Sequence, residues 1–366
     1  PLRPRRATAP PLPGAVLTLA LALLVLAGAC TGGKEPYHEA RILTFGTLVD
    51  VAVYGVDEAL AERAFTALEQ DFHYMNEAWH AWRPGTLGRF NTLCASGEPF
   101  TADPSTLPLI ALSTRLSEAS NALFNPAIGR LVALWGFHAD QPEPSVPPAA
   151  EIARLVLADP RMTDIVLDGV EARCLNPTVQ LDFGGFAKGY GVDRAVEALQ
   201  DMGIANAIVN AGGDLRAVGT RGPRPWRIGV RHPRQPGAVY AALELSGDES
   251  VFTSGDYERF YEVDGTRYHH IIDPRTGYPA GDTAAVTVIH AEATVADAAA
   301  TALFVAGPAR WREVARAMGI DQVMLITADG RLLMTPAMAD RVDLLAEPAA
   351  VRVEPLPPQR ERAATS

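Results

Sequence analysis

Cysteine is scarce in this chain: three occur in 366 residues, with no Cys-x-x-Cys pair and no Cys/His cluster at zinc-site spacing. A disulfide-built scaffold and a structural zinc site of the usual kind are therefore excluded. Positive charge is also in the minority, because 32 Lys and Arg stand against 43 Asp and Glu, for a net charge of −11. Such a chain lacks the positive face that nucleic-acid binding needs, so we expect no nucleic-acid partner.

The first thirty residues have the pattern of a secretory signal. Arginines without any acid precede a 15-residue apolar run, AVLTLALALLVLAGA, which is shorter than the ~20 residues of a membrane-spanning helix. Cys30 follows Ala-Gly-Ala as in a bacterial lipobox, although Ala27 stands where a larger aliphatic residue is usual. We expect a signal peptide over 1–29 and a tether over 30–40 that starts at a lipidated Cys30.

The protein would then be an exported bacterial lipoprotein, anchored in a membrane and facing the periplasm or the cell exterior. Two alternatives stay open, namely an uncleaved anchor helix and cleavage by ordinary signal peptidase. Cys94 and Cys174 would both lie in an oxidising compartment and are able to pair there, but the sequence leaves that pairing open.

Strands and helices alternate beyond the tether without regular βαβ spacing, which favours an α+β body with mixed sheets and packed helices. Strands are expected over 42–54, 179–183, 207–210, 238–245 and 284–290, with hairpins over 257–268 and 322–335. Helices are expected over 57–76, 107–119, 151–158, 188–202, 294–305 and 308–318. The body should span 41–345, and 346–366 should be a disordered tail.

The stretch from Asp182 to Tyr190, DFGGFAKGY, has a ligand-binding pattern. It should run from a strand end through paired glycines into a helix, where exposed N–H groups favour anions and glycine lets a ligand approach the backbone. Lys188 adds a positive charge there. The pattern is neither the dinucleotide fingerprint nor a Walker A loop, so a tight turn with a surface lysine is the alternative. A second glycine stretch, NAGGD from Asn210 to Asp214, by itself indicates a turn.

Hydroxyls, carboxylates and histidines flank the hairpin expected over 257–268. Ser254 and Asp256 precede it, and His269 and His270 end it. Adjacent strand residues face opposite sides, so at most one histidine faces a given site. His270 is either a general base or phosphate contact, or a structural residue. A Ser-His-Asp hydrolase built from Ser254, His270 and Asp256 is a further alternative, although the sequence has no G-x-S-x-G elbow.

Asp297 and Thr301 lie four residues apart in a helix whose other residues are nearly all apolar. That spacing puts both oxygens on one helix face, where an unpaired buried carboxylate would be costly. Carboxylate, hydroxyl, main-chain carbonyl and water form an oxygen-only ligand set that suits Mg²⁺. The alternative is a carboxylate that interacts with the positive end of the helix dipole.

Together and in this order, these stretches resemble the ApbE family of FAD:protein FMN transferases over 42–336. The motifs that carry the resemblance are DFGGFAKGYGVDRA, NAGGDLRAVG, TSGDYERFYEVDG, HIIDPRTGYP and ADAAATALFVAG. The resemblance implies an ApbE/T-fold-like α+β body with an FAD cleft. It also implies a reaction, protein flavinylation, in which a Thr or Ser hydroxyl of a target protein attacks the FMN phosphorus of FAD. Mg²⁺ holds the pyrophosphate, and AMP leaves.

The same resemblance implies roles for individual residues, with His270 as the group that activates the acceptor hydroxyl. The implied metal ligands are Gly185 through its carbonyl, Asp297, Ala300 and Thr301. The implied FAD contacts are Phe45, Trp82, Leu123, Phe124, Asn125, Asp182, Lys188, Ser254 and Ile271. Three of these depart from the usual family residue, because Phe45 replaces Met, Trp82 replaces Tyr and Asn125 replaces Asp.

The acceptor implied by the resemblance is a flavoprotein subunit of a membrane redox complex, of the Rnf or sodium-pumping quinone reductase type. Two other functions remain open. One is an FAD pyrophosphatase, in which water replaces the acceptor hydroxyl and the products are FMN and AMP. The other is a non-enzymatic exported flavin-binding protein that stores or delivers FAD.

Overall fold

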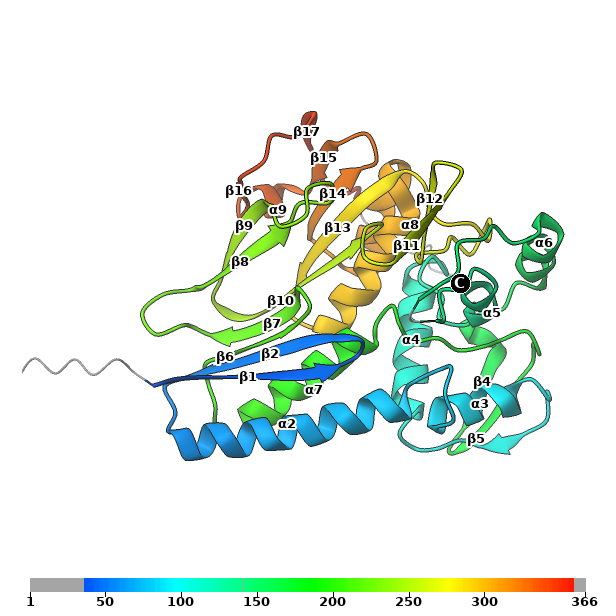
Figure 1. Cartoon of the computed structure of the whole chain (residues 1–366), viewed down its shortest axis with the longest axis horizontal. Coiled ribbons are helices and arrows are strands. Elements are labelled where there is room, and N and C mark those ends of the chain that lie inside the picture. The colour runs from blue at the N-terminus through cyan, green and yellow to red at the C-terminus, as the bar shows by residue number, and fades with distance from the viewer. Residues whose placement is uncertain (1–35, 140, 359–366) are drawn as a thin grey trace, which may run out of the picture. The chain divides into compact units, whose positions relative to one another are not determined.

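A nine-stranded sheet organises the chain from Tyr37 onward (Figure 1). The computed structural model describes residues 36–139 and 141–358, so the expected signal peptide, Cys30 and most of the expected tether lie outside the described residues. The strand order is β1-β2-β6-β7-β10-β13-β14-β15-β17. Neighbouring strands are antiparallel except for β15 and β17, which run parallel. This mixture of sheets and helices confirms the α+β class.

The strands of this sheet are β1 (Tyr37–Thr44), β2 (Thr47–Tyr54), β6 (Ala207–Ala211), β7 (Asp214–Gly219), β10 (Gly247–Gly255), β13 (Thr283–His290), β14 (Gln322–Thr327), β15 (Arg331–Met334) and β17 (Ala350–Val353). Smaller sheets contain β3 (Phe100–Thr101), β5 (Glu171–Cys174) and β4 (Ile165–Asp168), then β16 (Asp343–Leu344), β9 (Val239–Leu245) and β8 (Trp226–Arg231), and the hairpin β11 (Phe260–Val263) and β12 (Thr266–His269). The helices are α2 (Glu58–Ala78), α3 (Thr86–Cys94), α4 (Leu107–Ala119), α5 (Gly129–Leu134), α6 (Ala149–Ala158), α7 (Ala187–Asp201), α8 (Ala293–Met318) and α9 (Pro336–Ala339), with a 3-10 turn at Met162–Asp164.

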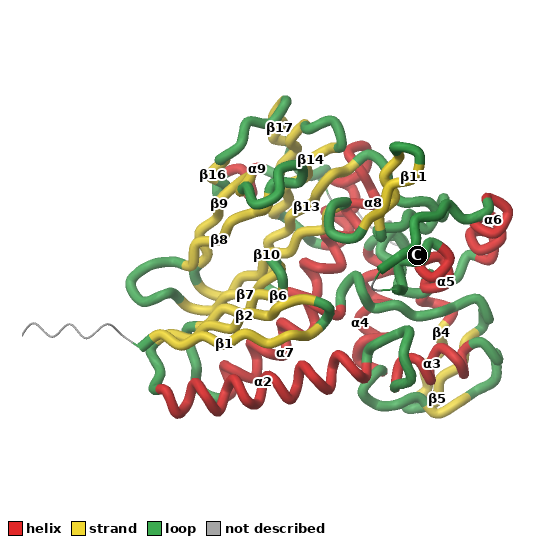
Figure 2. The backbone as a smooth tube through the Cα atoms, viewed as in Figure 1, coloured by secondary structure: helices red, strands yellow, loops and turns green. Residues whose placement is uncertain are grey.

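The central strands β7, β13 and β14 of the large sheet are buried on both faces. Helices α2, α7 and α8 cover one face, and Figure 2 shows α2 and α7 running beneath β1 and β2. On β13, Val286 and Val288 join the core under these helices, whereas Ala285 and Ile289 join the core shared with β8 and β9. Successive side chains of a strand point to opposite faces, so a strand covered on both sides is apolar throughout. This explains why the strand expected over 284–290 lacks polar alternation.

Two expected elements near the N-terminus need correction. The single strand expected over 42–54 is the hairpin β1–β2, which turns on Phe45 and Gly46, with φ of 51° and 69°. Strand β1 starts at Tyr37, inside the expected tether. A two-residue turn with both φ values positive usually carries Asn-Gly or Asp-Gly, and Phe-Gly does not give that signal. The hairpin expected around Asp264-Gly265 is confirmed, with φ of 50° and 76°.

The expected disordered tail is wrong over 346–358. Strand β17 pairs with β15, Leu356 packs against the main core, and Arg312 forms an ion pair with Glu354. These partners lie far away in the sequence, so the local composition of the tail did not reveal them. The strand expected over 179–183 is also wrong, since this segment forms only an isolated bridge between Gln180 and Ile128.

The remaining long elements agree with expectation to within a few residues, and α4 has the predicted bounds. The two helices expected over 294–318 are one element, α8, with a non-helical Gly307 (φ 66°) before Pro308. A disulfide joins Cys94 at the end of α3 to Cys174 at the end of β5. Among the described residues, no helix is both long enough and apolar enough to cross a membrane.

Candidate active site

The glycine-rich stretch starts α7 and places Lys188 in its first turn. The ammonium group of Lys188 forms an ion pair with one carboxylate oxygen of Asp214, the first residue of β7. The other oxygen of Asp214 accepts a hydrogen bond of 2.8 Å from the Thr253 amide. Burial alone would lower the pKa of Lys188, but the carboxylates of Asp214 and Asp297 outweigh it and raise that pKa. The charged ammonium group of Lys188 is therefore fixed by its ion pair with Asp214, and Lys188 is not a free surface lysine.

Asp297 extends from α8 toward the first turn of α7. It is only 6% exposed, and its Oδ2 accepts a hydrogen bond of 3.0 Å from the Gly189 amide. Burial raises the pKa of Asp297, while the charge of Lys188 and the Gly189 hydrogen bond oppose that rise. The carboxylate of Asp297 does interact with a helix N-terminus, which was the alternative to a metal ligand that the sequence left open. The helix is α7, however, and not the one that carries Asp297.

Thr301, one turn further along α8, completes this group of oxygens. Its Oγ1 lies 3.3 Å from Oγ of Ser254 on β10. Gly185 lies beside it, because a Cβ built there would be 3.6 Å from Thr301 Oγ1 and 3.5 Å from the Phe124 ring. Ala300 is buried within α8, and only its main-chain carbonyl oxygen could serve as a metal ligand. The structure thus brings Gly185, Ser254 and Thr301 together.

These residues fit a hard divalent cation, provided that a substrate supplies further ligands. Asp297 is a buried carboxylate whose raised pKa reflects incomplete compensation of its charge. Across 36–139 and 141–358, no group of three or more His, Cys, Asp or Glu side chains is arranged to hold a metal. Mg²⁺ is commonly bound by one or two carboxylates together with substrate phosphates and water. One carboxylate and one hydroxyl match that mode and not an all-protein cage.

Aromatic rings gather on another side of α7. Phe45 stacks on Trp79 with an interplanar angle of 6° and a centroid distance of 6.5 Å, and Tyr190 meets Trp79 edge to face. The Phe45 amide donates to Asn76 Oδ1 at 3.2 Å. Trp82 donates from Nε1 to Asp182 at 3.1 Å, and the other Asp182 oxygen accepts from the Gly184 amide at 2.8 Å. Trp82 thereby fixes the start of the glycine turn.

Leu123, Phe124 and Asn125 follow two residues with positive φ, Asn121 and Ala122. Leu123 and Phe124 are each 2% exposed, so their rings and branches belong to the core. Both ends of the Asn125 amide are engaged, because it donates to the Pro160 carbonyl at 2.8 Å and accepts from the Ala127 amide at 3.1 Å. A ligand can therefore use this segment through its backbone, and Asn125 holds that backbone in place.

The two histidines face different surroundings, as strand alternation requires. His269 is buried and bridges the Ala280 carbonyl and the Ile271 amide, at 2.8 and 3.3 Å. His270 is partly exposed, and its Nδ1 lies 3.3 Å from the Arg259 carbonyl. Although part of this side chain reaches solvent, the partial loss of water around its ring, with added repulsion from His269, Arg259 and Lys188, lowers the pKa of His270. His270 is thus neutral at pH 7.

The Ser-His-Asp alternative is not supported by these contacts. Asp256 is committed to Arg234, which donates to both carboxylate oxygens at 2.6 and 2.7 Å. The hydroxyl of Ser254 meets Thr301, and His270 meets a main-chain carbonyl. Each member of the supposed triad has another partner, so the three residues form no relay.

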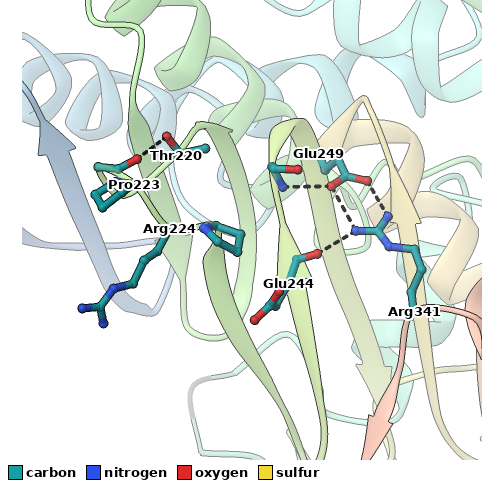
Figure 3. A pocket seen from close by; sticks show the side chains of 9 residues that line it. Thr220, Pro223, Arg224, Glu244, Glu249 and Arg341 are labelled. Atoms are coloured by element: carbon teal, nitrogen blue, oxygen red, sulfur yellow. Dashed lines mark hydrogen bonds and ion pairs between the residues drawn. The ribbon is translucent and has the colours of Figure 1, made fainter.

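Two surface hollows lie outside this group of residues. The larger, about 690 Å³, is lined by Thr220, Pro223, Arg224, Glu244, Glu249 and Arg341 among others (Figure 3). Arg341 there pairs with Glu249 and donates to the Glu244 carbonyl at 2.8 Å, while Arg224 points away. The smaller, about 420 Å³, is lined by Tyr74, Asn76, Glu77, Ala78, His80, Arg83, Pro84, Gly85 and Thr86. None of the predicted site residues lines either hollow.

Sequence reasoning missed two residues that hold the site together. The stretch NAGGD predicts a turn that includes Asp214, but only Gly212 and Gly213 turn, and Asp214 is the buried partner of Lys188. Asn91 clamps the backbone of Leu181 with two hydrogen bonds of 2.7 and 2.9 Å, directly before Asp182. Neither partner is near in sequence. The motif NAGGD marked Asp214 only through its place in the family pattern.

Comparisons with known proteins point to one family. A model described as the ApbE family matches residues 45–324. The chain is 41% identical over 344 residues to an FAD:protein FMN transferase of Rhodobacter capsulatus, covering 93% of this chain and 66% of that protein. It is 33% identical to an FAD:protein FMN transferase of Vibrio cholerae, covering 85% of this chain and 93% of the relative.

Two solved structures have a similar fold. The crystal structure of the ApbE protein from Thermotoga maritima has a TM-score of 0.76 at 32% identity, covering 83% of this chain and 98% of that one. The flavin transferase ApbE from Vibrio cholerae has a TM-score of 0.73 at 30% identity, covering 84% and 99%. Both matches extend over nearly the whole of the solved chains.

Proposed function

This chain belongs to the ApbE family, and on that premise we propose that it is an FAD:protein FMN transferase. A Ser or Thr hydroxyl of an acceptor protein attacks the FMN phosphorus of FAD. The bond from that phosphorus to the bridging pyrophosphate oxygen breaks, and AMP leaves. The observation that carries this proposal is the meeting of Lys188, Asp214, Asp297 and Thr301 at the start of α7.

Lys188 and the glycine turn form the pyrophosphate-binding part of the site. The cation of Lys188 is fixed by Asp214 before substrate arrives, which lowers the entropic cost of binding. The first N–H groups of α7 attract anions for the same reason that any helix N-terminus does. The nearest neighbours of a Cβ built on Gly185 are the Phe124 ring and the Thr301 side chain, at 3.5 and 3.6 Å. Because glycine lacks this Cβ, a phosphate can approach the backbone there.

Mg²⁺ is the proposed metal, held by Asp297, Thr301 and the Gly185 carbonyl. When bound, it supplies positive charge that stabilises the leaving AMP phosphate. The chain places two oxygen ligands for this metal side by side, because the buried carboxylate of Asp297 lies on the same helix face as the Thr301 hydroxyl. Ala300 contributes at most a carbonyl that also belongs to the hydrogen-bonding pattern of α8.

His270 is the proposed proton acceptor for the attacking hydroxyl. A carbonyl can only accept, so the contact with Arg259 places the ring proton on Nδ1 and leaves the lone pair of Nε2 available. The low pKa makes this nitrogen a weak base in the free enzyme. Since the positive charge of Lys188 contributes to that low pKa, binding of the anionic pyrophosphate beside Lys188 should raise it toward a useful value.

The flavin and adenine rings are proposed to use the aromatic side of α7. Trp82 presents an amphipathic ring whose Nε1–H is already directed by Asp182. Phe45 extends the apolar surface by stacking on Trp79. Both residues differ from the usual family choice yet keep an apolar or aromatic surface, which is what stacking requires.

The place of action is proposed to be outside the cytoplasm, with the chain anchored by a lipid on Cys30. The N-terminal sequence supports this proposal, and so does the disulfide between Cys94 and Cys174, because disulfides persist mainly in oxidising compartments. Palmitate labelling that disappears in Cys30→Ala is the expected result. Absence of labelling in the unmodified chain would contradict the lipid anchor and leave export to be judged by fractionation.

The acceptor is proposed to be a flavoprotein subunit of a membrane redox complex, of the Rnf or sodium-pumping quinone reductase type. Incubation of the chain with FAD, Mg²⁺ and such a purified subunit should add the mass of FMN to the acceptor and release AMP. Release of AMP and free FMN without an adduct would instead identify a pyrophosphatase. Flavin binding without any cleavage would identify a carrier.

A further inference from the structure

The two helices that carry the ionic groups each begin without a cap of their own. The residues before the first turns, Phe186 for α7 and Glu292 for α8, form no side-chain cap hydrogen bond. Yet the start of α8 is buried, with Ala293 and Thr294 at 0% and 2% exposure. Buried first-turn N–H groups need acceptors from elsewhere.

Each helix receives that acceptor from the other. The Gly189 amide in the first turn of α7 donates to Asp297 of α8 at 3.0 Å. The Ala293 and Thr294 amides in the first turn of α8 donate to Oδ1 and Oδ2 of Asp193 of α7, both at 2.8 Å. The Thr294 hydroxyl adds a bond of 2.5 Å to the same Oδ2.

The spacing of these contacts fixes how the helices lie on each other. Gly189 and Asp193 are four residues apart on α7, and Ala293 and Asp297 are four apart on α8, so each pair shares one helix face. The helices touch closely between the two contacts. A Cβ on Gly189 would lie 2.5 Å from the Ala293 carbonyl oxygen and 2.9 Å from Asp297 Cβ.

The charge of Asp193 is compensated within the core. Arg216 of β7 donates to Asp193 Oδ1 at 2.6 Å and to both oxygens of Asp248 at 2.7 and 2.8 Å. Asp193 and Arg216 have only 11% and 10% of their side chains exposed. A paired, hydrogen-bonded carboxylate of this kind is a stable part of the fold and costly to disrupt.

We propose that Asp193 and Asp297 form a reciprocal cap that sets the register of α7 against α8, which makes Asp193 a positioning residue for FMN transfer. Asp193 contacts no reacting atom in this account. It acts by holding the first turn of α8, and thereby Asp297 one turn later, opposite Lys188. This inference rests on the function proposed above.

Asp193→Asn is the direct test, because it keeps the shape and one carbonyl oxygen but loses the charge and one acceptor. We expect kcat to fall at least tenfold. The Mg²⁺ concentration that half-maximally stabilises the FAD complex against heat should rise several-fold. KM for FAD should change less than threefold, because the pair between Lys188 and Asp214 is untouched. Asp201→Asn, an exposed aspartate at the end of the same helix, is the matched control and should behave as the unmodified enzyme.

Thr294→Val is the second variant, since it removes only the hydroxyl bond to Asp193 and keeps the side-chain shape. Its kcat should fall two- to fivefold, with a smaller rise in the Mg²⁺ midpoint. If Asp193→Asn melts earlier but keeps the kcat and Mg²⁺ midpoint of the unmodified enzyme, Asp193 is merely structural and the proposal fails. If Asp193→Asn does not fold, Thr294→Val is decisive. A kcat and a Mg²⁺ midpoint equal to those of the unmodified enzyme in Thr294→Val would overturn the proposal.

Amide hydrogen exchange separates this proposal from the proposed function. It needs neither FAD nor an acceptor, so it remains decisive if the unmodified chain transfers no FMN. We expect faster exchange at Ala293 and Thr294 in Asp193→Asn, together with faster exchange at Gly189, because loss of one cap loosens the other. Faster exchange confined to α8 would show that the two caps are independent and would overturn the reciprocal arrangement.

Discussion

Two regions of the site meet on the first turns of α7 and are built in different ways. The ionic end consists of Lys188, Asp214, Asp297, Thr301 and Ser254, joined by an ion pair and directional hydrogen bonds. The ring end consists of Phe45, Trp79 and Tyr190, which are joined by ring packing, together with Trp82, which packs on His138. Directional contacts depend on exact atoms, whereas packing depends on area and shape.

Two glycines of α7 show the same difference. Gly189 faces the ionic end, where a Cβ would meet the Ala293 main-chain oxygen at 2.5 Å. Gly191 faces the ring end, where a Cβ would meet the edge of the Phe45 ring at 2.9 Å. A main-chain oxygen in a helix cannot yield, but a ring can rotate. Two of the three departures from the usual family residues, Phe45 and Trp82, likewise occur at the ring end, whereas the third, Asn125, belongs to neither end.

Asp297→Asn is expected to have the largest effect, because it removes the charge of the ionic end and keeps its shape. Transfer should fall roughly 100-fold or more, by analogy with loss of one key electrostatic group at an active site. The protein should stay folded, and stability without metal should be equal or higher, since a buried charge is removed. Mass spectrometry of the acceptor measures transfer, with Asp201→Asn as control. If Asp297→Asn in EDTA transfers FMN at the rate of the unmodified enzyme, Asp297 is only a cap of α7.

The variants Gly189→Ala and Gly191→Ala carry the same substitution on the same helix, the first at the ionic end of the site and the second at the ring end. Gly189→Ala should lower the free energy of unfolding by about 1–3 kcal/mol, because α7 and α8 must separate. Separation should also reduce transfer by tenfold or more. Gly191→Ala should cost less than ~1 kcal/mol, since ring rotation relieves the contact and alanine favours the helix. Urea unfolding measures both values. Equal losses would contradict the distinction between a rigid and a yielding end.

Lys188→Ala should weaken FAD binding by roughly 10- to 100-fold, since a hydrogen bond to a charged group contributes about 1.5–3 kcal/mol. The substitution also leaves the carboxylate of Asp214 without its cation and close to the carboxylate of Asp297. Part of the loss of FAD affinity should therefore persist at high salt. Flavin fluorescence titration measures the affinity. An unchanged affinity at moderate salt would place Lys188 outside the phosphate contact.

Substitutions at the ring end should have the smallest effects. Trp82→Phe loses the hydrogen bond to Asp182 but keeps an aromatic face, so KM for FAD should rise about three- to tenfold. Phe45→Met, which restores the usual family residue, should change KM less than threefold. Steady-state kinetics at fixed acceptor concentration check both. A loss as large as that of Asp297→Asn would show that the ring end is as exacting as the ionic end.

The sequence singles out individual residues more readily than the contacts among them. Asp297, Thr301 and Lys188 are predicted as site residues because polar residues in apolar helices and charges beside glycines are locally visible, and the structure brings Lys188 and Asp297 close together. At Asp214 the sequence predicts only a turn, since Asn and Asp beside glycine are ordinary turn formers. Asp193 lies on the apolar face of α7, but the amides that donate to its carboxylate belong to residues 100 and 101 positions away. No local pattern shows such a partner.

Local chemistry determined the helices with regular apolar spacing, the Asp-Gly hairpins and the order of the motifs. These features depend on residues a few positions apart, so periodicity and turn propensity suffice. Tertiary structure alone decided that Asp297 caps α7, that Cys94 bonds Cys174, and that β17 extends the sheet. Those outcomes join segments separated by at least about twenty residues, and only chain packing brings them within hydrogen-bonding or bonding distance.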